Sequence, residues 1–395
     1  MTTAATTTPE TRDGIRRRGT TWTALWWVND TATGEPRQRS KGGFRTRRDA
    51  VAHRTTQLAA INDGSYTEVT DKTITIGRFL TDVWLPAIRT GDRRPSTIAS
   101  YECAVDKWIT PHIGGIRLVA LTPRHVETLL ATLRESGGRH GQPLSDRSVQ
   151  YAYSTLRMAV DRAQRHGYVP RNVVATVDRP GAGQPSVDWW TTEQAQRFLR
   201  ATATDRLFAA WALLLARGPR RGEIAGLRWS DVDLDRGTAT IRHTRVSIGG
   251  RVVDSTPKTK AGGRTLSLDP GLVAVLRRHR TAQLADRMAA GPAWTNDADL
   301  VFTREDGQPY HPEHFSDRFD RLCAAADVPR IRLHDTRHTA ASLMLAAKTP
   351  VKIVQEMLGH ASPTITQTIY AHTIEGMGEA AGTQHSAALG IIADE

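Results

Sequence analysis

The chain has 395 residues and a formal net charge of +12, and its only cysteines are Cys103 and Cys323. The length predicts two or three domains, and the charge favours a polyanionic partner, nucleic acid before membrane. Two distant cysteines exclude a disulfide framework and a cysteine-type zinc site. The N-terminus lacks an apolar signal core, and the most apolar run, 208–216, is too short to span a bilayer. We therefore expect a soluble cytoplasmic protein with no membrane partner.

Residues 1–13 are polar and without periodicity, which predicts a disordered tail. In residues 14–68, the alternation of apolar and polar residues around Trp22, Leu25 and Trp27 predicts a small meander of strands. The apolar spacing in 47–64 predicts a helix. So small and arginine-rich a unit buries little core, and its basic face is a candidate DNA surface. A packing module with solvated charges fits these residues equally well. The candidate DNA contacts are Arg16, Arg17, Arg18, Trp22, Trp27, Arg45 and Arg47.

Residues 71–178 are expected to be mainly helical. Thr122 followed by Pro123 is typical of a helix start, and Ser145 is a candidate cap for the next helix, which Gly167 is expected to end. Apolar stripes follow both caps, at 126–133 and 149–160. Residues 179–186 are rich in Gly and Pro and predict a linker.

The last part, 187–395, mixes helices and strands. Helices are predicted at 191–203, 206–217, around 315–322 and at 334–347, 350–358 and 363–371. Strands are predicted at 238–246, 251–257 and 264–268. A small antiparallel sheet inside a mainly helical domain is the architecture that this order favours.

Two patterns in this part supply cations. In "RGPRRGE", Arg220 and Arg221 lie where a helix meets a Gly-Pro turn, so a guanidinium there would project from a fixed frame. In "STPKTKAGGRTLSL", Lys258 and Lys260 lie in the expected turn of a hairpin. The chain has 46 arginines and only seven lysines, and lysine differs from arginine in giving up a proton at modest cost. Taken singly, each pattern is more often solvated surface charge.

Two further patterns lie closer to the C-terminus. In "HDTRHT", His334 and Arg337 are three residues apart, so on a helix they share a face near its N-terminus. In "LGHASPTITQTIYAHT", Gly359 is expected to end one helix and to leave His360 in the break, while Tyr370 lies on the next helix.

Arginines, histidines, a lysine and a tyrosine together suit attack on a phosphodiester. Arginine forks stabilise the negative charge that builds on the phosphate oxygens in the transition state. A phenol attacks well only if cations favour the phenolate and a base accepts its proton, and a lysine can protonate the leaving oxygen. The sequence shows no carboxylate cluster with the spacing of a metal site.

In order and spacing, these four patterns resemble the tyrosine recombinase (phage integrase) family. The resemblance implies a metal-free, cofactor-free and ATP-free enzyme that exchanges DNA strands through a covalent 3′-phosphotyrosine. The catalytic residues that it implies are Arg220 with the supporting acid Glu223, Lys258 (Lys260 as fallback), His334, Arg337, His360 and the nucleophile Tyr370.

The resemblance also implies an α+β fold in three domains. Residues 14–68 resemble a three-stranded arm-site DNA-binding domain, 71–178 a helical SAM-like core-site domain, and 187–395 the catalytic domain. The implied partners are double-stranded core-type and arm-type DNA, three further copies of the chain in a tetramer on two duplexes, and an excisionase. An integrase of a mobile element that associates with the bacterial nucleoid is the expected function.

The sequence departs from the family pattern at a few positions. Pro219 and Thr336 stand where the family usually has larger apolar residues, and the adjacent Arg221 competes with Arg220 for the first arginine role.

Three rival functions are a zinc hydrolase, a non-catalytic DNA-binding relative and a type IB topoisomerase. A zinc hydrolase would bind its metal through His334, His338 and His360, but Asp335 replaces the required Glu. A non-catalytic DNA-binding relative would not need the full set of reactive residues. A type IB topoisomerase would share the chemistry but would not need the arm-like domain.

Overall fold

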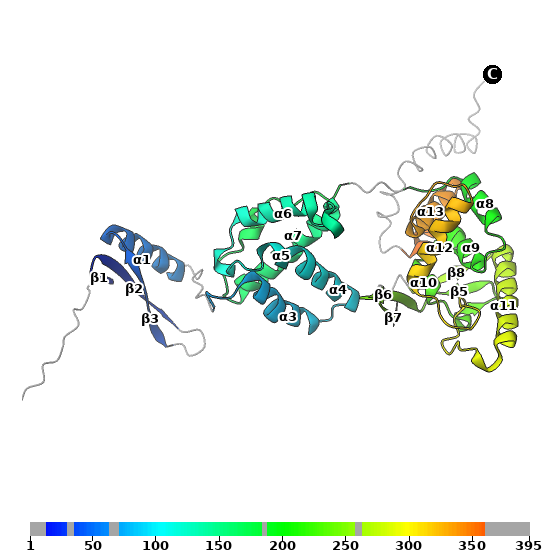
Figure 1. Ribbon diagram of the computed structural model, residues 1–395, viewed down its shortest axis with the longest axis horizontal. Helices are drawn as coiled ribbons and strands as arrows, with labels where there is room; N and C mark the ends of the chain where they lie inside the picture. Colours follow the sequence, from blue (N-terminus) through cyan, green and yellow to red (C-terminus); the bar gives the residue numbers. More distant parts are fainter. Residues whose placement is uncertain (1–12, 30–34, 63–70, 184–187, 257–262, 360–395) are drawn as a thin grey trace, which may run out of the picture. The chain divides into compact units, whose positions relative to one another are not determined.

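The computed structural model describes residues 13–29, 35–62, 71–183, 188–256 and 263–359. The chain divides into two compact units, 1–183 and 184–395, coloured blue to green and green to orange in Figure 1. Lys258, Lys260, His360 and Tyr370, together with the helix expected at 363–371, lie outside the described residues.

Residues 15–62 form a three-stranded antiparallel sheet with one helix packed against it (Figure 1). The buried side chains of its middle strand are Ala24, Trp26 and Val28, whereas Trp27 is 58% exposed and Leu25 half-buried. The predicted strand is therefore confirmed, and its even-numbered side chains are the ones that point to the core. Three successive apolar residues fit either face, and packing against the helix selects the even-numbered one. The elements are β1 (Ile15–Arg18), β2 (Thr21–Asn29), β3 (Pro36–Phe44) and α1 (Arg47–Asn62).

Residues 76–165 form four helical stretches around an apolar core of their own. The predicted caps are confirmed: the Thr122 hydroxyl accepts from the backbone N–H of His125, and the Ser145 hydroxyl accepts from that of Ser148. The predicted stripes at 126–133 and 149–160 are buried. The elements are α2 (Ile76–Arg78), a π-helical turn (Phe79–Trp84), α3 (Leu85–Arg89), α4 (Pro95–Cys103), a second π-helical turn (Ala104–Ile109), α5 (Thr110–Ile113), α6 (Pro123–Ser136) and α7 (Asp146–Arg165).

The second unit consists of helices and two small antiparallel sheets, ordered β4-β5-β8 and β6-β7; the core includes residues of β5 and β8 and none of β6 or β7. Its helices are α8 (Thr192–Ala201), α9 (Phe208–Arg217), α10 (Arg221–Ala225), α11 (Pro270–Ala290), α12 (Pro312–Ala325), α13 (Thr336–Ala346) and α14 (Val351–Leu358). Its strands are β4 (Val232–Asp233), β5 (Thr238–Thr240), β6 (Thr244–Ile248), β7 (Arg251–Ser255) and β8 (Thr265–Ser267).

An aromatic cluster holds the helices of this unit together. The rings of Trp190, Phe198, Trp211 and Phe319 are buried, with centroids 5.0–6.5 Å apart. The Trp190 backbone N–H also donates to the Thr339 hydroxyl on α13, 3.2 Å away. Because α13 is fixed to this core, the residues at its N-terminal end have a defined position.

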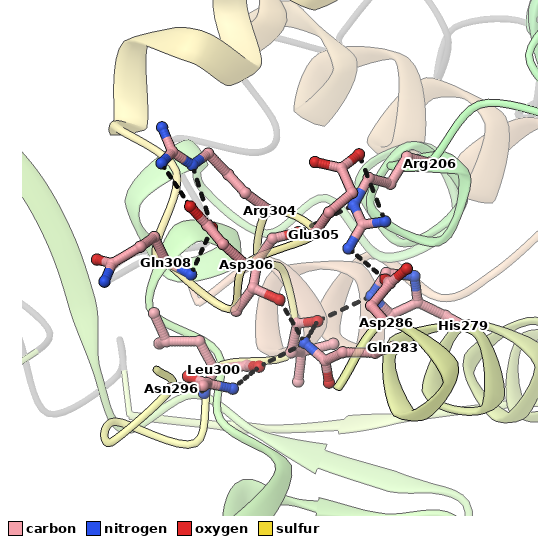
Figure 2. Close-up of polar contacts among 12 residues, drawn as sticks. Arg206, His279, Gln283, Asp286, Asn296, Leu300, Arg304, Glu305, Asp306 and Gln308 are labelled. Atoms are coloured by element: carbon pink, nitrogen blue, oxygen red, sulfur yellow. Dashed lines mark hydrogen bonds and ion pairs between the residues drawn. The ribbon is translucent and has the colours of Figure 1, made fainter. Parts of the chain in front are cut away.

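A buried polar network joins α11 to the 296–308 segment (Figure 2). Gln283 donates to the backbone oxygens of Leu300 and Val301, 3.1 Å away in each case. Arg206 donates to the backbone oxygen of Thr303 at 3.1 Å and to Asp286 at 2.6 Å. These buried polar groups have partners, so the network fixes the segment without leaving them desolvated and unpaired. Helix α11 is not among the helices that the sequence pattern predicts.

The α+β class is confirmed: a three-stranded sheet with a helix, a helical stretch, and a mainly helical unit with small antiparallel sheets. Over the residues described, none of the helices has the length and apolarity needed to cross a membrane.

Candidate active site

Arg220 stands at a corner between two helices. Helix α9 ends at Arg217, and Gly218 follows in the left-handed conformation with φ +61° and no penalty for a Cβ. Helix α10 begins at Arg221, so Arg220 has the extended backbone of an N-cap residue. The side chain of Arg220 is 42% exposed, which leaves it open to a ligand.

Glu223 holds Arg220 in place. Its two carboxylate oxygens accept from the Arg220 backbone N–H at 2.9 Å and from the Arg220 Nη1 at 2.8 Å. The Glu223 side chain is only 2% exposed. Burial alone would raise its pKa, but the Arg264 charge and the hydrogen bonds from Arg264 and Arg220 outweigh burial and hold the pKa below its usual value. Glu223 is therefore an anion that orients Arg220.

Arg264 is a residue that sequence reasoning missed. Its Nη2 donates to the Glu223 Oε2 at 3.0 Å, and its Nε donates to the backbone oxygen of Met357 on α14 at 2.6 Å. The side chain is 7% exposed. Nothing in the sequence separates Arg264 from the other 45 arginines, except its place at the end of the predicted lysine turn.

His334 and Arg337 lie where a short 3₁₀ turn, Leu333–Asp335, runs into α13. Arg337 is 3% exposed, and its Nη1 donates to the backbone oxygen of Gly218 at 2.8 Å. The first and third sequence patterns are thus in direct contact. The predicted helix 334–347 is confirmed except for its first turn, which is 3₁₀ rather than α.

The imidazole of His334 is disfavoured as a cation. Burial lowers the pKa of His334, and the charges of Arg337 and Arg220 lower it further, with Asp335 acting in the opposite direction. A neutral imidazole can accept a proton or donate a hydrogen bond at pH 7.

The residues of the rival zinc site have other partners. Asp335 is 3% exposed and accepts from the Arg332 Nε at 2.8 Å and from the Arg332 Nη2 at 2.9 Å. The rings of His334 and His338 are perpendicular, with centroids 6.0 Å apart. Within the described part of the chain, no three His, Cys, Asp or Glu side chains are grouped so as to hold a metal ion.

Arg221, the competitor of Arg220, has a different partner. Its Nη1 donates to the Ser316 hydroxyl on α12 at 3.0 Å. It lines a hollow of about 430 Å³ together with Arg330, Arg332 and His334, among other residues. The Arg220 side chain is hydrogen-bonded to Glu223 on α10, whereas the Arg221 side chain is hydrogen-bonded to Ser316 on α12. The two neighbouring arginines are therefore held by different helices.

Helix α14 leads toward the remaining predicted residues. It ends at Leu358, and Gly359 follows with φ +68°, which confirms the predicted stop. Leu358 is buried and lies close to Gly218: a Cβ added to Gly218 would be 2.6 Å from the Leu358 Cδ2. His360 is outside the described residues. In the sequence it comes two positions after Leu358, which lies against Gly218.

The N-terminal sheet divides its predicted DNA contacts between two faces. Arg16 and Arg18 pair with odd-numbered residues of β2, the face to which the exposed Trp27 also belongs. Arg17 pairs with Trp22 on the face that packs on α1, and its guanidinium lies 5.8 Å from the centroid of the Trp22 ring. The open face therefore carries Arg16, Arg18 and Trp27.

The other two predicted contacts, Arg45 and Arg47, follow the sheet and are exposed. Arg47 forms an ion pair with Asp13, and Arg45 precedes α1. Arg37 and Lys41 of β3, which are not among the predicted contacts, are also exposed.

Three family models match the chain. The phage integrase family matches residues 188–376, an arm DNA-binding domain matches 14–56, and the N-terminal SAM-like domain of phage integrases matches 78–133. The chain belongs to the tyrosine recombinase (phage integrase) family.

Relatives of this recombinase cover most of its length. An "Integrase" from Saccharopolyspora erythraea is 26% identical, covering 84% of this chain and 86% of the relative. A "Tyrosine recombinase XerC-like" protein from Caldanaerobacter subterraneus is also 26% identical, covering 84% and 87%.

Two solved structures share the recombinase fold. The integrase of transposon Tn1549, solved in complex with a circular intermediate DNA, has a TM-score of 0.64 at 19% identity and covers 78% of this chain and 99% of that one. A lambda integrase tetramer bound to a Holliday junction has a TM-score of 0.55 at 17% identity, covering 92% and 96%.

Proposed function

We propose that this site-specific recombinase integrates and excises a mobile DNA element through a covalent link between Tyr370 and DNA. The observation that carries the proposal is the convergence of Arg220, Arg337 and His334. Arg337 donates a hydrogen bond to the backbone oxygen of Gly218, two residues before Arg220, and His334 lies in the turn that leads into the helix carrying Arg337. Two fixed guanidinium groups beside a neutral imidazole suit a phosphodiester that gains negative charge.

The proposed step is a transesterification. The Tyr370 oxygen forms a bond to phosphorus while the bond from phosphorus to the 5′-oxygen breaks, which leaves a 3′-phosphotyrosine. Neutral His334 accepts the phenolic proton, and Lys258 protonates the leaving 5′-oxygen. Arg220, Arg337 and His360 stabilise the charge on the non-bridging oxygens. Attack by a free 5′-hydroxyl of the partner strand reverses these bonds and rejoins the DNA.

The remaining parts of the chain are proposed to bind DNA. Residues 14–68 contact arm-type sites through the open face of the sheet, and 71–178 contact core-type sites, with 179–186 as the linker to the catalytic domain at 187–395. Four copies would act on two duplexes, as in the lambda integrase tetramer on a Holliday junction, and an excisionase would set the direction. A topoisomerase or a non-catalytic relative lacks a specific observation in its favour.

The test uses a nicked duplex that carries the junction between the element and the chromosome, as found beside the gene. The wild-type chain should accumulate a covalent protein–DNA adduct that survives denaturation. Tyr370→Phe, which removes only the phenolic oxygen, should bind the same duplex and form no adduct. An adduct retained by Tyr370→Phe would show that the nucleophile is another residue.

A further inference from the structure

Arg264 links two parts of the recombinase that are far apart in sequence. Its Nη2 donates to Glu223 at 3.0 Å, a separation of 41 residues, and its Nε donates to the Met357 oxygen at 2.6 Å, a separation of 93 residues. Each acceptor gains from the Arg264 hydrogen bond. Glu223 is a buried anion. Met357 is in the last turn of α14, where a backbone oxygen has no donor from within the helix. The planar fork of arginine can serve both at once, whereas an ammonium offers one nitrogen.

We propose that Arg264 is a positioning residue for strand cleavage, which acts through Glu223 to set the Arg220 guanidinium and through Met357 to set the end of α14. The relay to Arg220 is short: Glu223 binds Arg264 and Arg220 with the same carboxylate. The relay to α14 fixes the turn that precedes His360. The inference rests on the proposed function, since it assigns Arg264 a role in that reaction.

The decisive substitution is Arg264→Lys, which keeps a positive charge but replaces the two donor nitrogens, Nε and Nη2, by one. Adduct formation on the nicked duplex should slow by roughly 10- to 100-fold, the effect expected when a reacting group is displaced by about 1 Å. Affinity for the same DNA should stay at the wild-type value. Arg264→Met, which removes both bonds and the charge, should be slower still.

Arg206 offers a matched control. It too joins a backbone oxygen and a carboxylate, donating to Thr303 at 3.1 Å and to Asp286 at 2.6 Å (Figure 2). Arg206→Lys should lower the unfolding midpoint about as much as Arg264→Lys does, and it should leave the cleavage rate near the wild-type value below that midpoint. Equal slowing by both substitutions would make Arg264 merely structural and overturn the proposal.

A double substitution separates action through Arg220 from a general loss of packing. If Arg264 acts through Arg220, Arg264→Lys should slow wild-type cleavage much more than it slows the Arg220→Ala variant. Glu223→Gln, the intermediate link, should behave in the same way. Full additivity of Arg264→Lys with Arg220→Ala would refute the relay through Glu223.

The wild-type reaction distinguishes the two hypotheses. A wild-type adduct together with an unimpaired Arg264→Lys variant overturns the role of Arg264 alone. Absence of a wild-type adduct on the junction duplex overturns the proposed function and, with it, the inference.

Discussion

Arg337 donates a 2.8 Å hydrogen bond to the backbone oxygen of Gly218, across 119 positions of sequence. The bond joins the N-terminal turn of α13 to the corner that presents Arg220. Two arginines from separate sequence patterns are thereby held in one frame, and the frame depends on the left-handed backbone of a single glycine.

Arg220 and Arg221 should differ sharply in their effect on cleavage. Arg220→Ala removes the guanidinium held by Glu223, whereas Arg221→Ala removes a hydrogen bond to Ser316. Loss of one charge-stabilising contact in such a site costs about 3–4 kcal/mol, roughly 10²- to 10³-fold in rate. Single-turnover cleavage of the nicked duplex measures both variants, and a crippled Arg221→Ala beside a mild Arg220→Ala would reverse the assignment.

Gly218→Ala should destabilise the catalytic unit and slow cleavage. The φ of +61° costs about 1–2 kcal/mol for a residue with a Cβ, and the new Cβ would be 2.6 Å from the Leu358 Cδ2. Gly249→Ala is the control, since Gly249 has φ +57° with no atom within 4 Å of an added Cβ. Urea unfolding should show a larger loss for Gly218→Ala, and only that variant should cleave slowly; equal losses would mean that the Leu358 contact is unimportant.

The pKa of His334 should lie below the ordinary value of 6.5 and should rise in Arg337→Gln, because the Arg337 charge lowers it. NMR titration of the His334 ring measures both. A depressed histidine pKa means that the unfolded chain binds the proton first as pH falls. The free energy of unfolding should therefore decrease as pH drops below about 6.5, with a shallower dependence in His334→Gln. An unchanged slope would show that His334 titrates alike in both states.

Lys258 should show a defect that depends on the leaving group. Arginine neutralises phosphate as well as lysine does, but with a pKa above about 12 it is a poor proton donor. A bridging 5′-phosphorothiolate leaves as a thiolate and needs less protonation, so it should restore Lys258→Ala toward the wild-type rate while Lys258→Arg stays slow on normal DNA. Rescue of Lys260→Ala instead would transfer the role to Lys260, and rescue of neither would direct the test to His334.

A chain lacking residues 1–69 should retain binding to core-type DNA and lose binding to arm-type DNA. The deletion removes the open sheet face with Arg16, Arg18 and Trp27. Each lost phosphate contact should reduce the slope of log K against log salt by about 0.9. Affinities measured at several salt concentrations provide the check; identical affinity of both chains for every site would remove the DNA-binding role from this sheet.

Much of the architecture follows from local signals in the sequence. The caps at Thr122 and Ser145 and the stop at Gly359 are correct because they depend on side-chain oxygens and backbone conformation within one turn. Helix α11 is not predicted from the sequence because it has no continuous apolar stripe. Most of its surface faces solvent, and within α11 only Leu272, Leu276 and Gln283 are buried.

The site shows the same division. The positions of Arg220, His334 and Arg337 are recognisable as patterns, and the hydrogen bond from Arg337 to Gly218 joins the helix start that carries His334 and Arg337 to the corner that carries Arg220. Arg264 depends on partners 41 and 93 residues away, so no local pattern reveals it. The face presented by Trp27 depends on which side of the sheet α1 covers, and three adjacent apolar residues leave that side open.

The cap that Glu223 forms on Arg220 also bears on how readily DNA is engaged. A free arginine side chain loses about 1.5–2 kcal/mol of rotamer entropy when it is immobilised. Arg220 is already held at its backbone N–H and its guanidinium before any DNA arrives. The fold therefore bears most of that ordering penalty in advance, and a phosphate meets a preorganised receptor rather than a mobile cation.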